Sequence, residues 1–134
     1  MTKFADEADA KQYLGGIFEH AMADDALAAE LATDLVLRIS YTDPDWTLTV
    51  DMGNRTVYLD PCDLTPAVEM FMTSDNGNKF WLGKLNLAAA MAKGQVRAKG
   101  SFPKILKLVP ASKKLFPRYE AMVREGGRDD LLNA

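Results

Sequence analysis

Hydrophobic and polar positions alternate along the first part of the chain with the period of a helix. Hydrophobic residues between Leu14 and Met22 recur at a spacing that places them on one face of a helix. Asp6 precedes this pattern and is a residue type that caps helix N-termini. The pattern predicts a helix over residues 6–23 and a second, short helix over residues 25–32.

From residue 35 the period changes to two, which is typical of β-strands with one covered face. Residues 43–45 (Asp-Pro-Asp) and 52–55 (Met-Gly-Asn-Arg) have the composition of turns and separate the alternating segments. The pattern predicts an antiparallel meander of three strands and two further strands, over residues 35–41, 46–51, 56–60, 67–73 and 95–99.

Helical spacing returns in the second half of the chain. The polar residues 74–77 (Ser-Asp-Asn-Gly) are expected to end the fourth strand, and Pro110 is expected to end a helix because proline disrupts helix interiors. The pattern predicts four helical segments, over residues 78–83, 86–92, 102–109 and 112–125.

Sequential strands followed by helical crossovers indicate an α+β fold. We expect a five-stranded mixed, mostly antiparallel sheet that is covered on one face by helices. The chain has 134 residues, of which 48% are hydrophobic and 26% are charged, and this composition suits one ordered domain over residues 1–134.

The net charge of −3 conceals an uneven distribution of charged residues. Residues 1–78 hold 4 Lys and Arg against 15 Asp and Glu, a net −11, whereas residues 79–134 hold 12 against 4, a net +8. The basic segment either attracts an anionic partner or folds against the acidic half of the same domain. Nucleic acid is not an expected partner, because the acidic half would repel phosphates.

The residue types that most enzymes need are scarce. The single histidine, His20, falls inside a predicted helix and has no evident nucleophile to activate. The single cysteine, Cys62, can form neither an internal disulfide nor a structural zinc site, and the glycine-rich nucleotide motifs are missing. We therefore expect no enzyme, no catalytic residue, no metal and no cofactor, with an enzyme of unrecognised site type kept as an alternative.

No segment of the sequence predicts membrane insertion or export. The longest apolar run, Leu87–Ala92, is far shorter than the roughly 18 residues that span a bilayer. The N-terminus lacks the apolar core of a signal peptide, and the C-terminus is not a Ser-Lys-Leu peroxisomal signal. These features lead us to expect a cytoplasmic protein.

Methionine and aromatic residues are abundant, with 7 Met, 6 Phe, 4 Tyr and 2 Trp. Several lie close together in the sequence, namely Met70, Phe71, Met72, Phe80, Trp81 and Met91. Such residues either fill an ordinary core or line a ligand pocket, since ligand pockets are concave and mostly apolar.

Residues 72–86 (MTSDNGNKFWLGKLN) and 91–100 (MAKGQVRAKG) carry a more specific signal. In this order a strand ends at a polar turn, a short helix leads to Gly-Lys-Leu, a second helix follows, and a glycine-flanked segment forms the last strand. With the preceding meander, roughly residues 10–110 resemble the sterol carrier protein (SCP-2-like) sterol/lipid-binding domain family. Without a peroxisomal signal, the chain is more similar to the small stand-alone bacterial members.

The resemblance implies an apolar tunnel between sheet and helices that holds a sterol, a fatty acyl chain or an acyl-CoA, and it implies no catalytic residue. Gly83 and Gly94 are expected to end helices, and the small residues Ala88–Ala90 are expected to let residues 83–100 form a thin lid over the sheet. Residues 102–134 depart from the family pattern, which leaves the wall of the tunnel that they form unassigned.

Strand parity and helical spacing give a set of hydrophobic residues for the tunnel lining. The predicted ligand-binding residues are Leu37, Ile39, Trp46, Leu48, Val50, Met70, Met72, Phe80, Trp81, Leu87, Met91, Val96, Ile105, Leu106 and Phe116. A set of basic residues is expected to attract a carboxylate, a coenzyme A phosphate or, transiently, an anionic membrane surface: Lys84, Arg97, Lys99, Lys104 and Lys107.

Two hypotheses of different classes follow. The first is non-enzymatic binding and carriage of a lipid, whose buried methylenes each contribute about 0.8 kcal/mol to the binding free energy. The alternative is an accessory protein-interaction domain that supports a lipid- or quinone-handling enzyme, and it predicts a filled interior with an exposed apolar patch. The sequence leaves the oligomeric state open.

Overall fold

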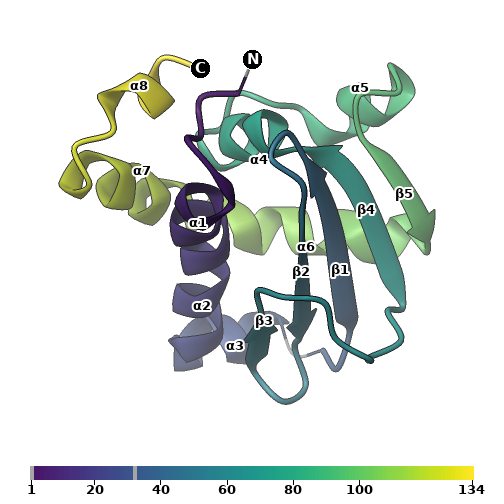
Figure 1. The fold of residues 1–134 in the computed structure, drawn as a ribbon. Helices are drawn as coiled ribbons and strands as arrows, with labels where there is room; N and C mark the ends of the chain where they lie inside the picture. Colours follow the sequence, from purple (N-terminus) through teal and green to yellow (C-terminus); the bar gives the residue numbers. More distant parts are fainter. Residues whose placement is uncertain (1, 32) are drawn as a thin grey trace.

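The chain folds into a five-stranded sheet with helices on one face and along one edge (Figure 1). The computed structural model describes residues 2–31 and 33–134. Sheet and helices together form the α+β arrangement that the sequence predicts, so the expected fold class is confirmed.

A long helix at the N-terminus lies beside the sheet. It consists of α1 (Glu7–Ala10), a π-helical segment η1 (Lys11–Gly15) and α2 (Gly16–Ala23), which follow one another without a break. The Asp6 carboxylate accepts a hydrogen bond from the Asp9 N–H at 2.8 Å and so caps the first turn. The helix predicted over residues 6–23 is confirmed.

A short helix, α3 (Asp25–Leu31), follows. The Asp24 carboxylate accepts from the Leu27 N–H at 3.0 Å, which satisfies one of the free amides of its first turn. The predicted end of this helix at Ala32 lies outside the described residues.

The five strands pair in the order β3-β2-β1-β4-β5. Their bounds are β1 (Val36–Thr42), β2 (Trp46–Asp51), β3 (Thr56–Tyr58), β4 (Val68–Thr73) and β5 (Arg97–Gly100). β1 and β4 run parallel, and the other neighbouring pairs are antiparallel. The sheet is therefore mixed and mostly antiparallel, as predicted, although β3 and β5 are shorter than the alternating pattern suggested.

The register of the sheet gathers hydrophobic side chains on one face. Ile39 of β1 lies opposite Leu48 of β2 and Met70 of β4, and Leu37 likewise lies opposite Val50 of β2. Since directly opposed residues point to the same side of a sheet, these positions form one apolar face that must be covered.

The other face is crossed by the segment that links β3 to β4. The Arg38 guanidinium reaches this segment and donates to the Leu64 carbonyl at 2.6 Å and to the Cys62 carbonyl at 3.3 Å. Figure 1 shows the segment passing in front of β2 and β1 near their lower ends. Arg38 thus fastens the crossover that allows β4 to pair in parallel with β1.

Five helices belong to the second half of the chain. They are α4 (Ser74–Trp81), α5 (Leu87–Ala92), α6 (Phe102–Lys113), α7 (Phe116–Glu125) and α8 (Asp129–Leu132). In Figure 1 α6 runs behind β1 and β4, across the apolar face, while α7 and α8 lie beyond it toward the N-terminal helix. None of the helices within the described residues is both long and apolar enough to cross a bilayer.

Residues 74–77 end the fourth strand as predicted, since β4 ends at Thr73, but the helix expected from residue 78 already begins at Ser74, so these residues form the first turn of α4. The Thr73 side chain accepts a hydrogen bond from the Asn76 N–H at 3.0 Å, so the helix begins as soon as the strand ends. Gly77 is buried against Tyr41, where a Cβ would lie 2.9 Å from the Tyr41 ring. The glycine therefore allows close approach of the helix to β1.

The prediction that Pro110 ends a helix was wrong, because α6 continues through it to Lys113. Ile105 and Ala111 are buried on either side of the proline. The burial of this helix face against the sheet outweighs the lost hydrogen bond, a cost of roughly 3 kcal/mol in a helix interior.

The expected lid of residues 83–100 is replaced by α6. Gly83 and Gly94 do end helices, with φ of 76° and 75°, but Ala88 and Ala89 of α5 are exposed. α5 lies at the upper end of β4 and β5 in Figure 1, and it is α6 that covers the sheet.

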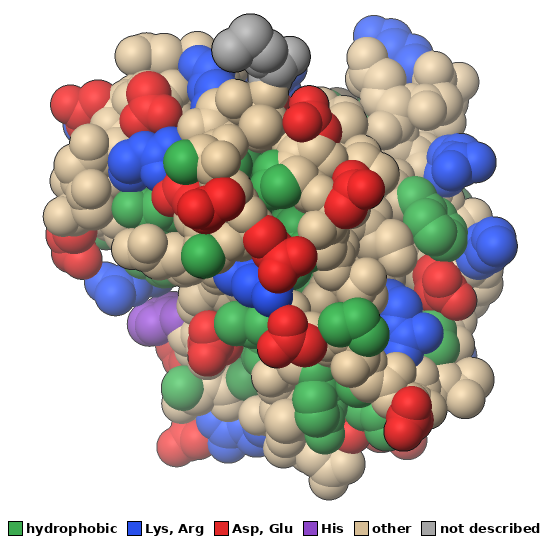
Figure 2. All heavy atoms as spheres, in the orientation of Figure 1, with side chains coloured by type: hydrophobic (Ala, Val, Ile, Leu, Met, Phe, Trp, Pro, Cys, Tyr) green, Lys and Arg blue, Asp and Glu red, His purple; other side chains and the backbone are tan. Residues whose placement is uncertain are grey.

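Acidic side chains are most frequent on one side of the surface visible in Figure 2, with some Lys and Arg among them, and basic side chains are most frequent on the other. Figure 2 shows acidic side chains over the N-terminal helix and basic side chains along the edge formed by α5 and β5. The acidic and basic halves also meet, since Lys114 Nζ lies 2.8 Å from Glu30 Oε1 and Arg128 pairs with Asp9. The basic segment therefore folds against the acidic half, one of the two possibilities left open by the sequence.

Candidate functional site

An apolar cavity of about 80 Å³ lies between the sheet and α6. β1 and β4 form its floor, α6 covers it, and residues of α2, α3, α4 and α5 complete the sides. The cavity remains because several separate helices, rather than one continuous layer, cover the sheet face. A hollow of this kind between packed layers is the usual location of a small-molecule site.

The floor of the cavity follows from the alternation of the strands. Leu37 and Ile39 of β1 and Met70 and Met72 of β4 point to the covered face, and all four are buried and line the cavity. Parallel pairing of β1 with β4 sets Ile39 beside Met70. Two adjacent strands therefore present a continuous apolar surface to the helix above.

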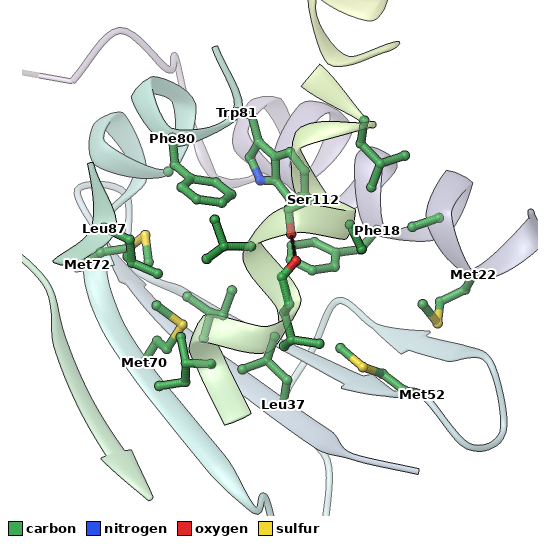
Figure 3. A pocket seen from close by; sticks show the side chains of 18 of the residues that line it. Phe18, Met22, Leu37, Met52, Met70, Met72, Phe80, Trp81, Leu87 and Ser112 are labelled. Atoms are coloured by element: carbon green, nitrogen blue, oxygen red, sulfur yellow. Dashed lines mark hydrogen bonds between the residues drawn. The ribbon is translucent and has the colours of Figure 1, made fainter. Parts of the chain in front are cut away.

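The cover of the cavity is the inner face of α6. Ile105, Leu108, Val109 and Ser112 project from it toward the sheet at helical spacing. The Ser112 hydroxyl donates to the Leu108 carbonyl at 2.7 Å, as the dashed line in Figure 3 shows. The serine thus satisfies its polar hydrogen within the helix.

One side of the cavity is a cluster of aromatic rings. The Trp81 ring packs edge-to-face against Phe18 at 5.4 Å and against Phe80 at 5.2 Å between ring centroids. Phe116 packs edge-to-face on Phe80 from outside at 5.6 Å. These contacts give this side a fixed shape, since each such pair contributes about 0.5–1.5 kcal/mol beyond the area it buries.

Methionines occupy both ends of the cavity. Figure 3 shows Met70 and Met72 on one side of α6 and Met22 and Met52 on the other. Methionine is flexible and polarizable, so its side chain adapts to ligands of different outline. The lining can therefore change shape at its ends while its aromatic side stays fixed.

No charged side chain lines the cavity among the residues that the structure describes. The lining side chains that carry a polar atom are Ser112, Tyr41 and Trp81, and burial raises the pKa of the Tyr41 hydroxyl above its ordinary value. An ionised group inside this cavity would lose its hydration without gaining a counter-charge. The site therefore suits apolar or uncharged molecules.

The structure brings together about half of the predicted lining. The predicted residues that line the cavity are Leu37, Ile39, Met70, Met72, Phe80, Trp81, Leu87 and Ile105. Three predicted residues of β2, Trp46, Leu48 and Val50, are buried on the same sheet face but belong to the core beside the cavity.

The remaining predicted residues lie elsewhere. Met91 and Val96 pack at the α5 end of the core, and Phe116 contacts the aromatic cluster from outside. Leu106 is 40% exposed because it points away from the sheet on the outer face of α6.

Several lining residues were missed by the prediction. The sequence pattern could have identified Phe18, Met22 and Tyr41 as lining residues, because they share the helical spacing or strand parity of the predicted residues. Met52 was assigned to a turn, and Leu108 and Val109 belong to a segment whose place in the fold the resemblance did not define.

The basic residues expected to attract an anion lie in three separate places. Lys84 donates to the carbonyl of Leu132 at 2.5 Å, and Arg97 and Lys99 stand over the Phe71 ring on the opposite face of the sheet. The last two, Lys104 and Lys107, are exposed on α6.

A polar groove between α3 and α6 adjoins the cavity. Lys104 and Lys107 line this groove, and the cavity and the groove share Leu108 and Ala111 as lining residues. These two side chains therefore stand between the apolar interior and a groove in which Glu30 and Asp34 accompany the two lysines. Movement of α6 away from α3 would join the two.

No metal-binding cluster is found in residues 2–31 and 33–134. They contain no group of three or more His, Cys, Asp or Glu placed to hold a metal ion. Burial opposes ionisation of the Cys62 thiol, but hydrogen bonds from the Leu64 N–H, Thr49 and Arg38 hold its pKa below the ordinary value. Cys62 lies outside the cavity, in the crossover segment, and His20 is exposed on α2.

Comparison with known proteins identifies the fold. No protein-family model and no curated protein matches the chain. The sterol carrier protein domain 2 of Helicoverpa armigera matches with a TM-score of 0.63 and 16% identity, over 79% of this chain and 87% of that chain. The chain has the sterol carrier protein 2 fold.

Two further solved structures with the sterol carrier protein 2 fold are similar to the chain. Sterol carrier protein 2 from Yarrowia lipolytica, in the apo form, has a TM-score of 0.62 and 13% identity over 73% of this chain and 85% of that chain. Sterol carrier protein 2 from Aedes aegypti, solved with palmitate, has a TM-score of 0.54 and 18% identity over 65% and 87%. The resemblance seen in the sequence is thus confirmed at the level of fold.

Proposed function

We propose that the protein binds and carries a lipid, such as a fatty acyl chain or a sterol, in the cavity beneath α6 and catalyses no reaction on it. The observation that carries this proposal is the cavity itself, which is apolar and has no charged lining residue among those described. The palmitate bound by the Aedes aegypti protein of the same fold supports the ligand class.

The size of the cavity requires it to widen when a lipid binds. Its volume of about 80 Å³ is below the roughly 300 Å³ of the smallest common ligand pockets. The flexible methionines at both ends and the single helix that covers the cavity are the parts that can move. Binding is therefore expected to displace α6 rather than the sheet.

An accessory protein-interaction domain is the weaker alternative. It predicts a filled interior, whereas the structure has a hollow between sheet and α6. The exposed Phe102 and Leu106 of α6 suit the apolar surface that this alternative also predicts, but the hollow interior does not suit it.

The direct test is native mass spectrometry of protein purified from cells, together with titration of acyl chains and sterols. The variant Ala111→Phe fills the cavity, because Ala111 is buried in its lining. Ala121→Phe is the matched control, since Ala121 is on α7 and is not part of the lining. We expect Ala111→Phe to weaken binding at least about tenfold and Ala121→Phe to leave it unchanged.

Absence of any bound lipid in the wild-type protein, both as purified and in the titrations, would contradict the proposal. Equal binding by the two variants would place the ligand outside the cavity. Thermal unfolding of each variant checks that the larger side chain has left the fold intact.

We further propose that the outer face of α6 contacts anionic membranes. Of the described large hydrophobic residues, the exposed ones are Phe102 (38%) and Leu106 (40%) on α6 and Tyr58 (37%) on β3. Lys104 and Lys107 lie on the same helix, are exposed and take part in no ion pair with a described residue. A helix with apolar and basic side chains on its outer face suits the surface of an anionic bilayer.

A further inference from the structure

The Tyr41 side chain is enclosed at one end of the cavity. Its ring stacks on Trp46 with centroids 4.7 Å apart, and the Gly77 backbone lies against its edge. The residue is 3% exposed and lines the cavity. Tyr41 thus brings a phenol hydroxyl into a mostly apolar interior, in which Ser112 and the indole of Trp81 carry the other polar side-chain atoms.

The Tyr41 hydroxyl has no hydrogen-bond partner among the described residues, and burial alone raises its pKa. Every side-chain N or O atom that the described protein encloses fully does have a partner. Because the Tyr41 hydroxyl has no such partner, it is not fully enclosed and retains some accessible surface. We assign this surface to the cavity, since Tyr41 is one of its lining residues. Its proton is available as a hydrogen-bond donor at neutral pH.

A second buried tyrosine, Tyr119, differs from Tyr41 because its hydroxyl does have a hydrogen-bond partner. The Tyr119 hydroxyl donates to Asn78 Oδ1 at 2.7 Å, and Asn78 Nδ2 donates to the Leu131 carbonyl at 2.9 Å. This network is complete without a ligand. Ser112 is also satisfied, since its hydroxyl donates to the Leu108 carbonyl.

We propose that the Tyr41 hydroxyl binds the polar end of an uncharged lipid, such as a long-chain alcohol, ketone, quinone or ester, that enters the cavity with this end first. The inference rests on the proposed lipid-binding function. Buried polar groups are nearly always paired in native proteins, so an unpaired one at a ligand cavity points to a partner that the ligand supplies. The partner is uncharged because one phenol cannot replace the hydration of a carboxylate where no cation lines the cavity.

The test compares two ligands of equal chain length, 1-hexadecanol and hexadecane, as competitors of a fluorescent acyl probe. The variant Tyr41→Phe removes only the hydroxyl, and Tyr119→Phe is its matched control. We expect wild type to bind hexadecanol about five- to tenfold more tightly than hexadecane, and Tyr41→Phe to abolish this ratio by weakening hexadecanol alone.

The ligand-free proteins give a second readout. Tyr41→Phe loses no hydrogen bond to a described residue, so its midpoint of thermal unfolding should equal or exceed that of wild type. Tyr119→Phe leaves Asn78 without its partner, so its midpoint should fall, while the ratio of hexadecanol to hexadecane binding should stay at the wild-type value.

Two results would overturn the inference without touching the proposed function. One is a wild-type protein that binds both ligands equally, a result that needs no variant. The other is a preference for hexadecanol that survives in Tyr41→Phe. If neither ligand displaces the probe and no lipid binds at all, it is the proposed function that fails.

Discussion

At the scale of single residues, Asn78 shows how one buried amide joins three helices. It is 1% exposed on α4, accepts from the Tyr119 hydroxyl of α7 and donates to the Leu131 carbonyl of α8. Each of these groups would otherwise be buried without a partner, at a cost of about 1–3 kcal/mol. Asn78 therefore stabilises the wall of helices behind the aromatic cluster.

Replacing Asn78 tests this role. We expect Asn78→Ala to lower the free energy of unfolding by about 2–4 kcal/mol, because both partners lose their hydrogen bonds. The measurement is urea unfolding followed by circular dichroism. Asn76→Ala on the same helix is the control, since Asn76 is only half-buried and should change stability by less than about 1 kcal/mol.

Arg128 joins the two ends of the described chain. Its guanidinium donates to the Lys3 carbonyl at 2.9 Å, to Asp130 at 3.0 Å and to Asp9. The hydrogen bond from Arg128 holds the pKa of Asp130 below its ordinary value. We expect Arg128→Ala to cost about 1–2 kcal/mol at neutral pH, discounted for partial exposure of the ion pairs.

The contribution of Asp130 has a definite pH dependence. A carboxylate whose pKa is lower in the folded than in the unfolded state stabilises the fold above the unfolded pKa, near 4, and this stability is lost as the pH falls through the folded pKa. The difference in stability between wild type and Arg128→Ala should therefore shrink as the pH falls from 7 through the folded pKa of Asp130, and the part due to the Lys3 carbonyl should remain. A difference that stays constant from pH 7 to pH 2 would contradict the role of the Asp130 carboxylate.

At the scale of elements, the end of β5 depends on one glycine. Gly100 has a φ of 100°, and a Cβ at this position would lie within overlap distance of the carbonyl oxygen of Ala67, the residue before β4. Both the backbone conformation and the close approach require glycine. Gly94 has a φ of 75° but no atom within 4 Å of its added Cβ, so it shares only the first requirement.

The two glycines form a matched pair of sites. We expect Gly94→Ala to destabilise the protein by about 1 kcal/mol, the cost of the left-handed conformation. Gly100→Ala should cost at least about 2 kcal/mol more, because the strands must also move apart. Thermal unfolding of both variants measures the difference, and equal costs would show that β4 and β5 separate freely at this end.

Strands and helices differ in how far the sequence determines them. The alternation of β1 and β4 predicted which side chains form the cavity floor, because strand parity is a local property. The start of α4 and the passage of α6 through Pro110 were missed, because a cap by Thr73 and burial of Ile105 and Ala111 decide them. Parity alone could not show that β2 lies beside the cavity, since that depends on which helix covers which strand.

At the scale of the whole molecule, the opposite charges of the two halves have different roles. Part of the basic half pairs with the acidic half, as Lys114 does with Glu30. Lys104 and Lys107 are exposed on α6, where they line the groove beside α3, and Phe102 and Leu106 are exposed on the same helix. The proposed membrane contact therefore lies on the helix that covers the cavity.

Vesicle sedimentation tests the membrane contact. We expect Lys104→Glu/Lys107→Glu to weaken binding to vesicles of phosphatidylcholine and phosphatidylglycerol at least about tenfold, since each lysine contributes about 1 kcal/mol near an anionic surface. Lys93→Glu is the control for charge, as Lys93 is exposed at the end of α5. Raising the salt concentration from 0.1 to 0.5 M should also weaken the binding of wild-type protein to these vesicles, because salt screens the attraction between charges.

The apolar part of the contact has its own control. Phe102→Ser/Leu106→Ser should also weaken vesicle binding, whereas Tyr58→Ser, which removes the third exposed large hydrophobic of the described chain, should not. Binding that is indifferent to both α6 variants, or equal on vesicles of phosphatidylcholine alone, would reject α6 as the membrane contact.

Pro110 should increase the rate at which the cavity opens to solvent and lipid. Because proline has no N–H, the Leu106 carbonyl lacks its partner one turn later, so α6 is weakest above the middle of the cavity. Local opening of this helix breaks no strand pairing. Amide protons of α6 should therefore exchange with deuterium well before those of β1 and β4. The rate of lipid uptake should then depend on local opening of α6 and not on global unfolding.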